Sequence, residues 1–447
     1  MKNAKKVAII MLVAIAIVMG GYIAYSLAVQ PEYQPQIEVF PGQIADDEAD
    51  ASVWGEFYPE HWESYQRNYE MRPTRYNGSV PEDKTIMYPY LPIIYGGMGF
   101  AEDYLEDRGH VYSVEDIRHI HESRRPLAVC WTCKSSQAHL IIEREGVDYY
   151  SMAWGDLEEE VVHPIGCLNC HNPEDMSLTV RNPAFIEAMD RLGIDVADAT
   201  QQEMRSYVCG QCHVEYYFRP DDKYLIFPWD NGFHPDDIER YFDDIGFNDW
   251  THAITGAEVI KIQHPEFELW SLSTHGQAGV SCADCHMPYV RVGNTKMSSH
   301  HWQSPLNTLN ESCRTCHIQS VDWLRQQVYD RQDKTKRLLD IAAYALVDAI
   351  EEIALALEEG NYNEQSLEEA RYLQRRAQLR VDFFIADNST GAHNPTLALE
   401  VLGVAIEQAH EARKAAEMAR LGELYEAPRD IQRGEGARDD AYLEQYN

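Results

Sequence analysis

The stretch Cys130-Trp131-Thr132-Cys133-Lys134 is the first of five C-x-x-C pairs, and these pairs contain all ten cysteines of the 447-residue chain. In the other four pairs a histidine follows directly: Cys167-Leu168-Asn169-Cys170-His171, Cys209-Gly210-Gln211-Cys212-His213, Cys282-Ala283-Asp284-Cys285-His286 and Cys313-Arg314-Thr315-Cys316-His317. C-x-x-C-H is the attachment signature of a c-type haem, in which two thiols bond the porphyrin edge and the imidazole ligates the iron. The sequence therefore predicts five covalently bound haem c groups, one of which has an amine in place of the imidazole.

Other uses of paired cysteines fit this pattern less well. A C-x-x-C pair can be half of a zinc site or a thiol redox pair. Zinc sites bring two such halves together and do not require a histidine after the second cysteine, so four C-x-x-C-H repeats with no cysteine left over disfavour them. A disulfide framework is also disfavoured, because a chain of this length can bury a large core without covalent cross-links.

The composition and the N-terminus limit the cellular setting. The formal net charge is −35, which argues against a nucleic-acid partner. Three lysines among the first six residues precede an apolar run from Val7 to about Val29. This run is long enough to span a bilayer, while Ser26-Leu27-Ala28 offers small residues for signal cleavage. Residues 1–30 are therefore a membrane anchor, which we favour, or a cleaved signal. Either one predicts a periplasmic or otherwise extracytoplasmic body.

The rest of the chain divides into four segments by composition. A linker with prolines and acidic residues spans 31–50, a pentahaem region rich in Tyr, Trp, Pro and His spans 51–320, long helices span 321–427, and a polar tail spans 428–447. Strand patterns with a period of two residues are scarce. We therefore predict a mainly α fold, a multihaem cytochrome c with a haem-packed core, long C-terminal helices and little β-structure.

Three long helices are predicted after residue 320. In the first, which runs to about residue 358, apolar residues alternate in steps of four and three and form an a/d seam: Leu339, Ala343, Leu346, Ile350, Ile353 and Leu357. The seam packs either against another helix of this chain or against a second copy. Gly360-Asn361 ends this helix. A capping box of Ser366 and Glu369 starts the second, which runs to about Ile385. Asn394-Pro395 opens the third, which runs to about Leu421.

Lys134 makes the first haem chemically different from the others. A low-spin haem needs two axial ligands, so four histidines outside the motifs suffice to close the other four haems as electron carriers. An amine ligates iron only when it is deprotonated. Such a ligand changes the electronics of the opposite coordination position, which favours an open, substrate-binding iron there. The simpler alternative is that Lys134 is an ordinary lysine and a distant histidine takes its place.

The chain resembles the pentahaem cytochrome c nitrite reductases, the ammonia-forming catalytic subunits, over roughly residues 90 to 420. The most specific match is a C-x-x-C-K motif in first place among five. In the family the lysine-ligated haem is the active site, and the other four are bis-histidine electron carriers. The matching segments are Gly109-His110-Val111-Tyr112, Ser273-Thr274-His275-Gly276, His300-His301-Trp302 and Thr390-Gly391-Ala392-His393-Asn394-Pro395. They imply His110, His275, His301 and His393 as distal ligands of the third, fifth, second and fourth haems.

The resemblance also implies a calcium ion beside an active-site pocket. Cys212-His213-Val214-Glu215-Tyr216 and Lys261-Ile262-Gln263-His264-Pro265 match two family signatures. They imply one calcium ion bound by the Glu215 carboxylate, the Gln263 amide oxygen and the backbone carbonyls of Tyr216 and Lys261. Hard oxygen ligands of this kind fit calcium. Tyr216 and His264 would face the open site of the first haem.

The family's catalytic arginine has no direct counterpart in this chain. The ungapped position is Glu122, and the loop before the first motif is shortened to Glu122-Ser123-Arg124-Arg125-Pro126. An anion-reducing pocket needs a fixed cation, and arginine stays charged. We expect Arg124 to supply it, with Arg125 and Arg118 as alternatives.

The implied activity is the six-electron reduction of nitrite to ammonium at the Lys134 haem. The resemblance further implies a membrane quinol-oxidising multihaem cytochrome as electron donor and a homodimer through the C-terminal helices. The alternative is an electron-transfer conduit in which all five irons are closed, and the Tyr216 and His264 pair argues against it. Hydroxylamine and sulfite stay open as further substrates, because similar pocket chemistry suits them.

Overall fold

The computed structural model describes residues 6, 11, 15, 18–20, 42–76, 78, 80–106, 108–120, 124 and 127–427. Most of the expected anchor or signal at 1–30, residues 31–41 of the linker and the tail at 428–447 lie outside these residues. Within the described part of the chain, no helix is both long and apolar enough to cross a membrane. The chain divides into two compact units, and the larger one, residues 40–290 and 298–447, carries all five cysteine pairs.

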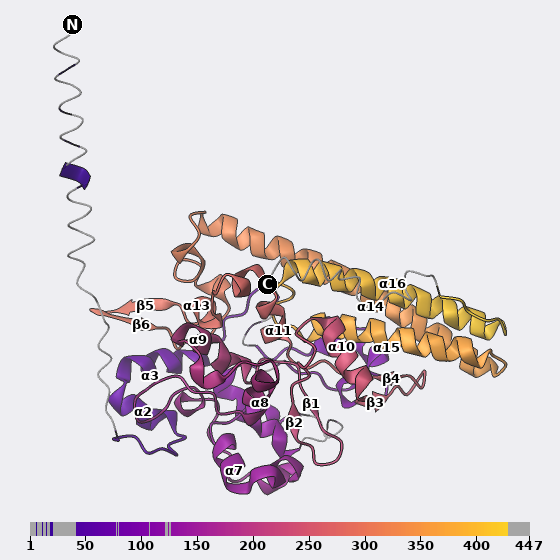
Figure 1. Cartoon of the computed structure of the whole chain (residues 1–447), viewed down its shortest axis with the longest axis horizontal. Helices are drawn as coiled ribbons and strands as arrows, with labels where there is room; N and C mark the ends of the chain where they lie inside the picture. The colour runs from indigo at the N-terminus through magenta and orange to yellow at the C-terminus, as the bar shows by residue number, and fades with distance from the viewer. Residues whose placement is uncertain are drawn as a thin grey trace. The chain divides into compact units, whose positions relative to one another are not determined.

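Three long helices dominate the C-terminal third of the larger unit. They are α14 (Val321–Glu359), α15 (Glu364–Ala386) and α16 (Pro395–Arg420), and they lie side by side as long rods (Figure 1). The Ser320 side chain accepts a hydrogen bond from the backbone of Trp323 at the start of α14, and Gly360 ends the helix in the left-handed conformation with φ 71°. The predicted bounds of the first and third helices are therefore confirmed.

The predicted capping box of the second helix is wrong. Asn363 caps α15, and its side-chain oxygen accepts the backbone N–H of Ser366 at 3.1 Å. Ser366 already lies inside the helix, where its hydroxyl donates to the carbonyl oxygen of Glu423 at 2.8 Å. Asn and Ser are about equally good caps, and the contact with the chain after α16 places Ser366 inside the helix.

The a/d seam of α14 packs within the chain. Leu339, Ala343, Leu346, Ile350 and Ile353 are fully buried, and α14 contacts both α15 and α16 along their lengths. Of the two partners that the sequence left open, a helix of this chain or a second copy, the structure shows the first. Because these side chains are already covered, the seam is not available to a second copy.

The region before α14 is built from short helices joined by loops. Its α-helices are α2 (Ala51–Phe57), α3 (Pro59–Gln66), α4 (Lys84–Met87), α5 (Leu91–Ile94), α6 (Ser113–Ile117), α7 (Ala138–Glu145), α8 (Pro183–Arg191), α9 (Gln201–Gly210), α10 (Pro235–Asp244), α11 (Glu266–Ser271), α12 (Thr274–Gln277) and α13 (Cys282–His286). Short 3₁₀ turns lie between them, among them η2 (Gly99–Ala101), η5 (Ala128–Cys133), η8 (Cys167–Asn169) and η11 (Cys313–Thr315).

Strands are few and short among the described residues. The pairs are β1 (Tyr217–Phe218) with β2 (Leu225–Ile226), β3 (Trp250–Thr251) with β4 (Glu258–Val259), and β5 (Tyr289–Val292) with β6 (Thr295–Ser298). The first two are antiparallel, with Tyr217 opposite Ile226 and Trp250 opposite Val259. The predicted mainly α fold with little β-structure is therefore confirmed.

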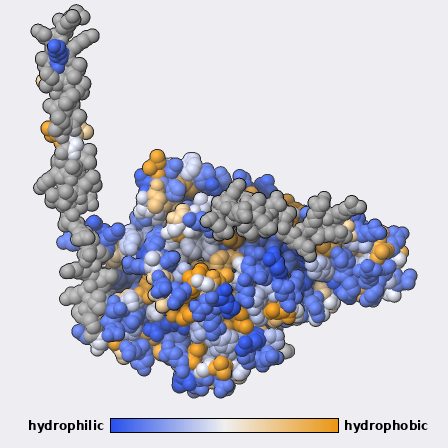
Figure 2. Space-filling view, viewed as in Figure 1, coloured by the Kyte–Doolittle hydropathy of each residue, from blue (hydrophilic) through white to orange (hydrophobic). Residues whose placement is uncertain are grey.

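Two apolar clusters position the functional region. The larger one joins α14, α15 and α16 to α5 and to the chain around Ile260 and Ile262. The second surrounds the first cysteine pair and includes Trp131, Tyr149 and Phe267. The visible face of the larger unit is mainly hydrophilic, with apolar residues in smaller patches (Figure 2), which agrees with the acidic composition.

Candidate functional site

Each of the five C-x-x-C pairs lies on a single helical turn. The first and fourth pairs lie on η5 and α13, and the second, third and fifth pairs begin on η8, α9 and η11 and end one or two residues after them. Residues three apart on such a turn point to the same side, so both thiols of a pair face one direction. All ten cysteines are unbridged, as attachment of a haem requires.

The five pairs form a connected series in space. Cys133 of the first pair contacts Cys212 of the third, and Cys209 of the third contacts Cys282 of the fourth. Three further interactions between thiols are electrostatic: Cys285 of the fourth pair interacts with both thiols of the fifth, and Cys170 of the second pair interacts with Cys212. The spatial order is thus first, third, fourth, fifth, with the second pair branching from the third.

Four pairs of histidine rings lie at the spacing that one metal ion between them requires. A metal–imidazole bond is about 2.0 Å long and the ring centroid lies about 1.1 Å behind the nitrogen, so the two centroids should be about 6 Å apart. The observed separations are 5.9 Å for His110 and His213, 6.2 Å for His275 and His317, 6.2 Å for His286 and His393, and 6.2 Å for His171 and His300.

In several of these rings the Nδ1 atom already has an acceptor. It lies 2.9 Å from the Met176 carbonyl oxygen in His171, 3.0 Å from the Gln303 carbonyl oxygen in His286 and 3.0 Å from the Ser298 carbonyl oxygen in His300. In His213 and His393 it faces a carboxylate, Glu266 at 3.8 Å and Asp387 at 3.5 Å. Such contacts orient a metal-binding histidine and leave Nε2 as the ligating atom.

The structure brings His300, rather than the expected His301, to His171. The backbone N–H of His300 donates to the Ser64 hydroxyl at 2.9 Å, and its carbonyl oxygen accepts from the Asn68 amide at 2.7 Å. These contacts from α3 and the turn after it fix the segment so that the His300 ring faces His171. The ring of His301 instead contacts the Gln303 amide through Nδ1 at 3.2 Å. The ring that faces His171 is thus that of His300 and not that of the neighbouring His301, which the resemblance implies.

Around the first pair the structure gathers three of the predicted active-site residues. The backbone carbonyl oxygen of Lys134 accepts a hydrogen bond from the Ser113 hydroxyl at 2.6 Å. Burial, followed by the thiols of Cys130 and Cys133, raises the pKa of Tyr216 well above its ordinary value, while Arg124 acts in the opposite direction. Tyr216 and Arg124 therefore lie at the first pair, and the phenol of Tyr216 keeps its proton. Glu122 and Arg125 lie outside the described residues.

The predicted calcium ligands meet in a buried cluster. The Glu215 carboxylate accepts the backbone N–H of Gln263 at 2.5 Å, and the Gln263 amide nitrogen lies 3.3 Å from the Lys261 carbonyl oxygen. Glu215 is 0% exposed, and its Oε1 has no hydrogen-bond partner. Burial and then the nearby carboxylates raise the pKa of Glu215 well above its ordinary value. A buried carboxylate oxygen without a partner fits a bound cation.

Three acidic residues that the sequence analysis missed surround this cluster. Glu268 accepts the backbone N–H of Glu215 at 2.8 Å, and burial raises its pKa to about 8. Asp249 accepts the backbone N–H of Lys261 at 2.8 Å, and burial raises its pKa to about 7. Asp382 on α15 accepts the backbone N–H of Ile262 at 2.7 Å. They come from segments far apart in the chain, so no local motif could have indicated them.

His264 lies just before α11. Its carbonyl oxygen accepts the backbone N–H of Glu266 at 2.9 Å, and its imidazole interacts electrostatically with the Glu266 carboxylate, which also faces His213. His264 is therefore close to the pair of His110 and His213 as well as to the Gln263 segment.

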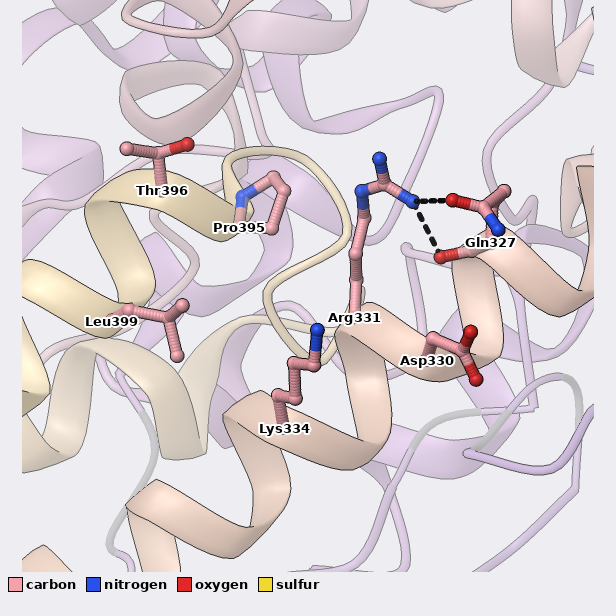
Figure 3. A pocket seen from close by; sticks show the side chains of 7 residues that line it. All are labelled: Gln327, Asp330, Arg331, Lys334, Pro395, Thr396 and Leu399. Atoms are coloured by element: carbon pink, nitrogen blue, oxygen red, sulfur yellow. Dashed lines mark hydrogen bonds between the residues drawn. The ribbon is translucent and has the colours of Figure 1, made fainter.

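A cavity of about 360 Å³ opens between α14 and α16 (Figure 3). Gln327, Asp330, Arg331 and Lys334 of α14 line it together with Pro395, Thr396 and Leu399 of α16. Arg331 donates to the backbone carbonyl and the side-chain oxygen of Gln327, at 2.7 and 3.2 Å. After burial and His317, the Arg331 charge is a further cause that lowers the pKa of His275, so one residue that lines the cavity is within electrostatic range of the pair of the fifth motif.

The family model for cytochrome c552 matches residues 50–433. A cytochrome c-552 from Bacteroides fragilis is 41% identical over 383 residues, which cover 83% of this chain and 78% of the relative. One from Maridesulfovibrio salexigens is 34% identical over 386 residues, which cover 82% and 75%. The catalytic subunit (NrfA) of cytochrome c nitrite reductase from Desulfovibrio desulfuricans ATCC 27774, a structure described with two calcium sites, matches with a TM-score of 0.81 and 34% identity over 90% of this chain and 91% of that chain. The chain belongs to the cytochrome c552 family.

Proposed function

We propose that this chain is an ammonia-forming nitrite reductase, which reduces nitrite to ammonium with six electrons at the site of Cys130, Cys133 and Lys134. The observation that carries the proposal is the single C-x-x-C-K pair, at which Tyr216 and Arg124 also lie. A solved relative that is 34% identical over nine tenths of the chain is a cytochrome c nitrite reductase. The proposal extends that activity to this chain.

The residues fit five covalently bound haem c groups. Ten thiols would attach them, and Lys134, His171, His213, His286 and His317 would supply the proximal ligands. We propose His300 as distal ligand of the second haem in place of His301, and His110, His393 and His275 for the third, fourth and fifth, on the strength of their ring separations. When bound, the haems supply one-electron carriers and one iron with an open coordination position.

Arg124 and Tyr216 at the first pair, together with His264 from the segment before α11, would bind the anion and deliver protons. The Arg124 guanidinium can pair with a nitrite oxygen. Tyr216 holds its phenolic proton because burial raises its pKa, so it can donate a hydrogen bond to the other oxygen. His264, next to the Glu266 carboxylate, can pass a proton to an oxygen that leaves as water.

One calcium ion would complete the cluster beside this pocket. Its ligands would be the Glu215 carboxylate, the Gln263 amide oxygen and the backbone carbonyls of Tyr216 and Lys261. The partnerless Glu215 oxygen and the raised pKa values of Asp249 and Glu268 support a missing positive charge at this point. Oxygen ligands without thiolate favour calcium over transition metals. The ion would hold the backbone of Tyr216 in place.

The partners follow from the same proposal. The substrate is nitrite, and the donor is a membrane quinol-oxidising multihaem cytochrome outside the cytoplasm. Because the seam of α14 is buried within the chain, a homodimer would use other faces of the long helices, and α14 exposes Ile341, Tyr344 and Leu355.

Ammonium formed from nitrite by the haem-loaded protein, with a reduced viologen dye as donor, tests the activity. We expect near one ammonium per nitrite and about six dye electrons per turnover. A protein that carries all five haems but forms no ammonium would be an electron conduit instead.

A further inference from the structure

Phe100 lies between the proposed anion pocket and the proposed calcium cluster. It belongs to the turn η2 (Gly99–Ala101). The guanidinium carbon of Arg124 lies over its ring at 4.1 Å from the centroid, and the ammonium of Lys261 at 5.1 Å. The Tyr104 ring packs edge-on against it, at 4.8 Å between centroids. One phenyl ring therefore contacts both cations of this region.

The two cations have different settings. The ammonium of Lys261 is 3.1 Å from the Asp382 carboxylate, and both side chains are 0% exposed. It also lies over the rings of Tyr95 and Tyr104, at 5.2 Å each. Lys261 is thus held by a carboxylate and three aromatic rings together, and the loss of one ring leaves the ion pair intact.

Arg124 sits on the shortened loop before the first pair and acts electrostatically on Cys130 and Tyr216. A carboxylate in contact with Arg124 would fix its position but would also cancel its charge and occupy its N–H groups. An aromatic face attracts a guanidinium through the ring quadrupole and leaves the charge and the in-plane N–H donors available. The Phe100 ring supplies such a face.

We propose that Phe100 is a positioning residue that holds the Arg124 guanidinium at the anion pocket and thereby determines the affinity for nitrite. The proposal rests on the proposed function, because it assigns to Arg124 the binding of the substrate anion. It adds a residue outside the haem motifs and the calcium ligands, and it accounts for how a shortened loop can present a fixed cation.

The test compares Phe100→Leu with the wild type for an anionic and an uncharged substrate. Arg124 is partly buried, and a cation–π contact between the exposed and the desolvated cases corresponds to roughly a tenfold change in affinity, so Phe100→Leu should raise KM for nitrite about tenfold. KM for hydroxylamine, which is uncharged at pH 7.5, should change less than about twofold by the same reasoning. Phe100→Trp should restore the nitrite KM, since it keeps an aromatic face.

Two controls separate this role from a structural one. Tyr104→Leu removes a ring from Lys261 but none from Arg124, so it should leave the ratio of the two KM values unchanged. In an Arg124→Gln background, Phe100→Leu should have no further effect on nitrite. Equal losses for both substrates, a nitrite KM equal to that of the wild type, or additive effects with Arg124→Gln would overturn the proposal.

Nitrite binding to the oxidised protein, followed by absorbance, distinguishes this inference from the proposed function. If the wild type binds nitrite but forms no ammonium, the activity is wrong while a weaker binding by Phe100→Leu still supports the positioning role. Should Phe100→Leu lose haem, the nitrite affinity is compared among Phe100→Trp, Phe100→Tyr and Phe100→Ile instead. An affinity that is unchanged in Phe100→Tyr but lost in Phe100→Ile would support the role of the aromatic ring. No nitrite binding by the wild type would overturn both proposals.

Discussion

Replacement of His300 by alanine tests the proposed ligands of the second haem more sharply than any other change. The His300 ring lies 6.2 Å from His171 between centroids, the separation that one iron between two imidazoles requires. His301 is its immediate neighbour and is directed elsewhere, with Nδ1 on the Gln303 amide. The matched control is therefore His301→Ala, which removes the same chemistry one residue away.

The expected magnitude follows from the number of motifs. Five cysteine pairs with four histidine pairs and one lysine site imply one open iron in five. His300→Ala would leave His171 without an opposite ligand, so the open, high-spin share should double to two in five. The segment itself should stay in place, because its contacts with Ser64 and Asn68 use the His300 backbone. His301→Ala should keep one in five.

Electron paramagnetic resonance of the oxidised variants, with the haem content measured on the same samples, provides the assay. His61 needs attention, because its ring lies 5.2 Å from that of His300 and its Nδ1 is buried without a hydrogen-bond partner. It can swing towards the iron in the alanine variant, so both variants are also made with His61→Gln. The assignment of His300 as the distal ligand would be refuted if the high-spin signal doubled in His301→Ala and stayed at the wild-type level in His300→Ala with His61→Gln.

Three further predictions concern the active site, the calcium cluster and stability. Lys134→His should keep five haems but lower the rate of ammonium formation, because the ligand opposite the substrate changes, and an unchanged rate would remove the special role of the lysine. Treatment with a calcium chelator should lower activity, restored by calcium but not magnesium, and Glu215→Gln should weaken calcium binding at least about tenfold by calorimetry; a chelated protein at full activity would exclude the site. Glu239, buried against Arg380 at 2.8 Å and Arg376 at 3.1 Å, should tie α10 to α15. Burial pushes the pKa of Glu239 up, and the two arginines more than offset this, so that its pKa lies below the ordinary value. Glu239→Gln should therefore cost about 3–5 kcal/mol of unfolding free energy at pH 7. This difference should be complete above the unfolded glutamate pKa of about 4.3 and disappear as the pH falls through the lower folded pKa, and urea unfolding curves that differ equally at pH 7 and pH 3 would contradict it.

The long helices could be predicted because their signals are local. The seam, Gly360 and Asn394-Pro395 each act within a few residues, and the bounds of α14 and α16 agree with them. The cap of α15 could not be chosen from local sequence, because Asn363 and Ser366 are both good caps. The contact of Ser366 with Glu423, 57 residues away, decides between them.

The histidine pairs likewise could be predicted in part from local sequence and in part not. Counting the motifs predicts that such pairs exist, and the family to which the motifs point was confirmed. The choice between His300 and His301 does not follow, because adjacent residues of an extended segment point to opposite sides. Which side faces His171 depends on Ser64 and Asn68, which lie more than two hundred residues earlier in the chain.

The sequence by itself determined the local features of this protein: five C-x-x-C pairs, a lysine after the first, and three long helices, since each depends on residues within one or two helical turns. Only the tertiary structure decided which groups face one another. It placed the α14 seam within the chain, paired His171 with His300, put Arg124 on the ring of Phe100 and joined Lys261 to Asp382 across 121 residues. Such contacts depend on how distant segments pack, and no local pattern carries that information.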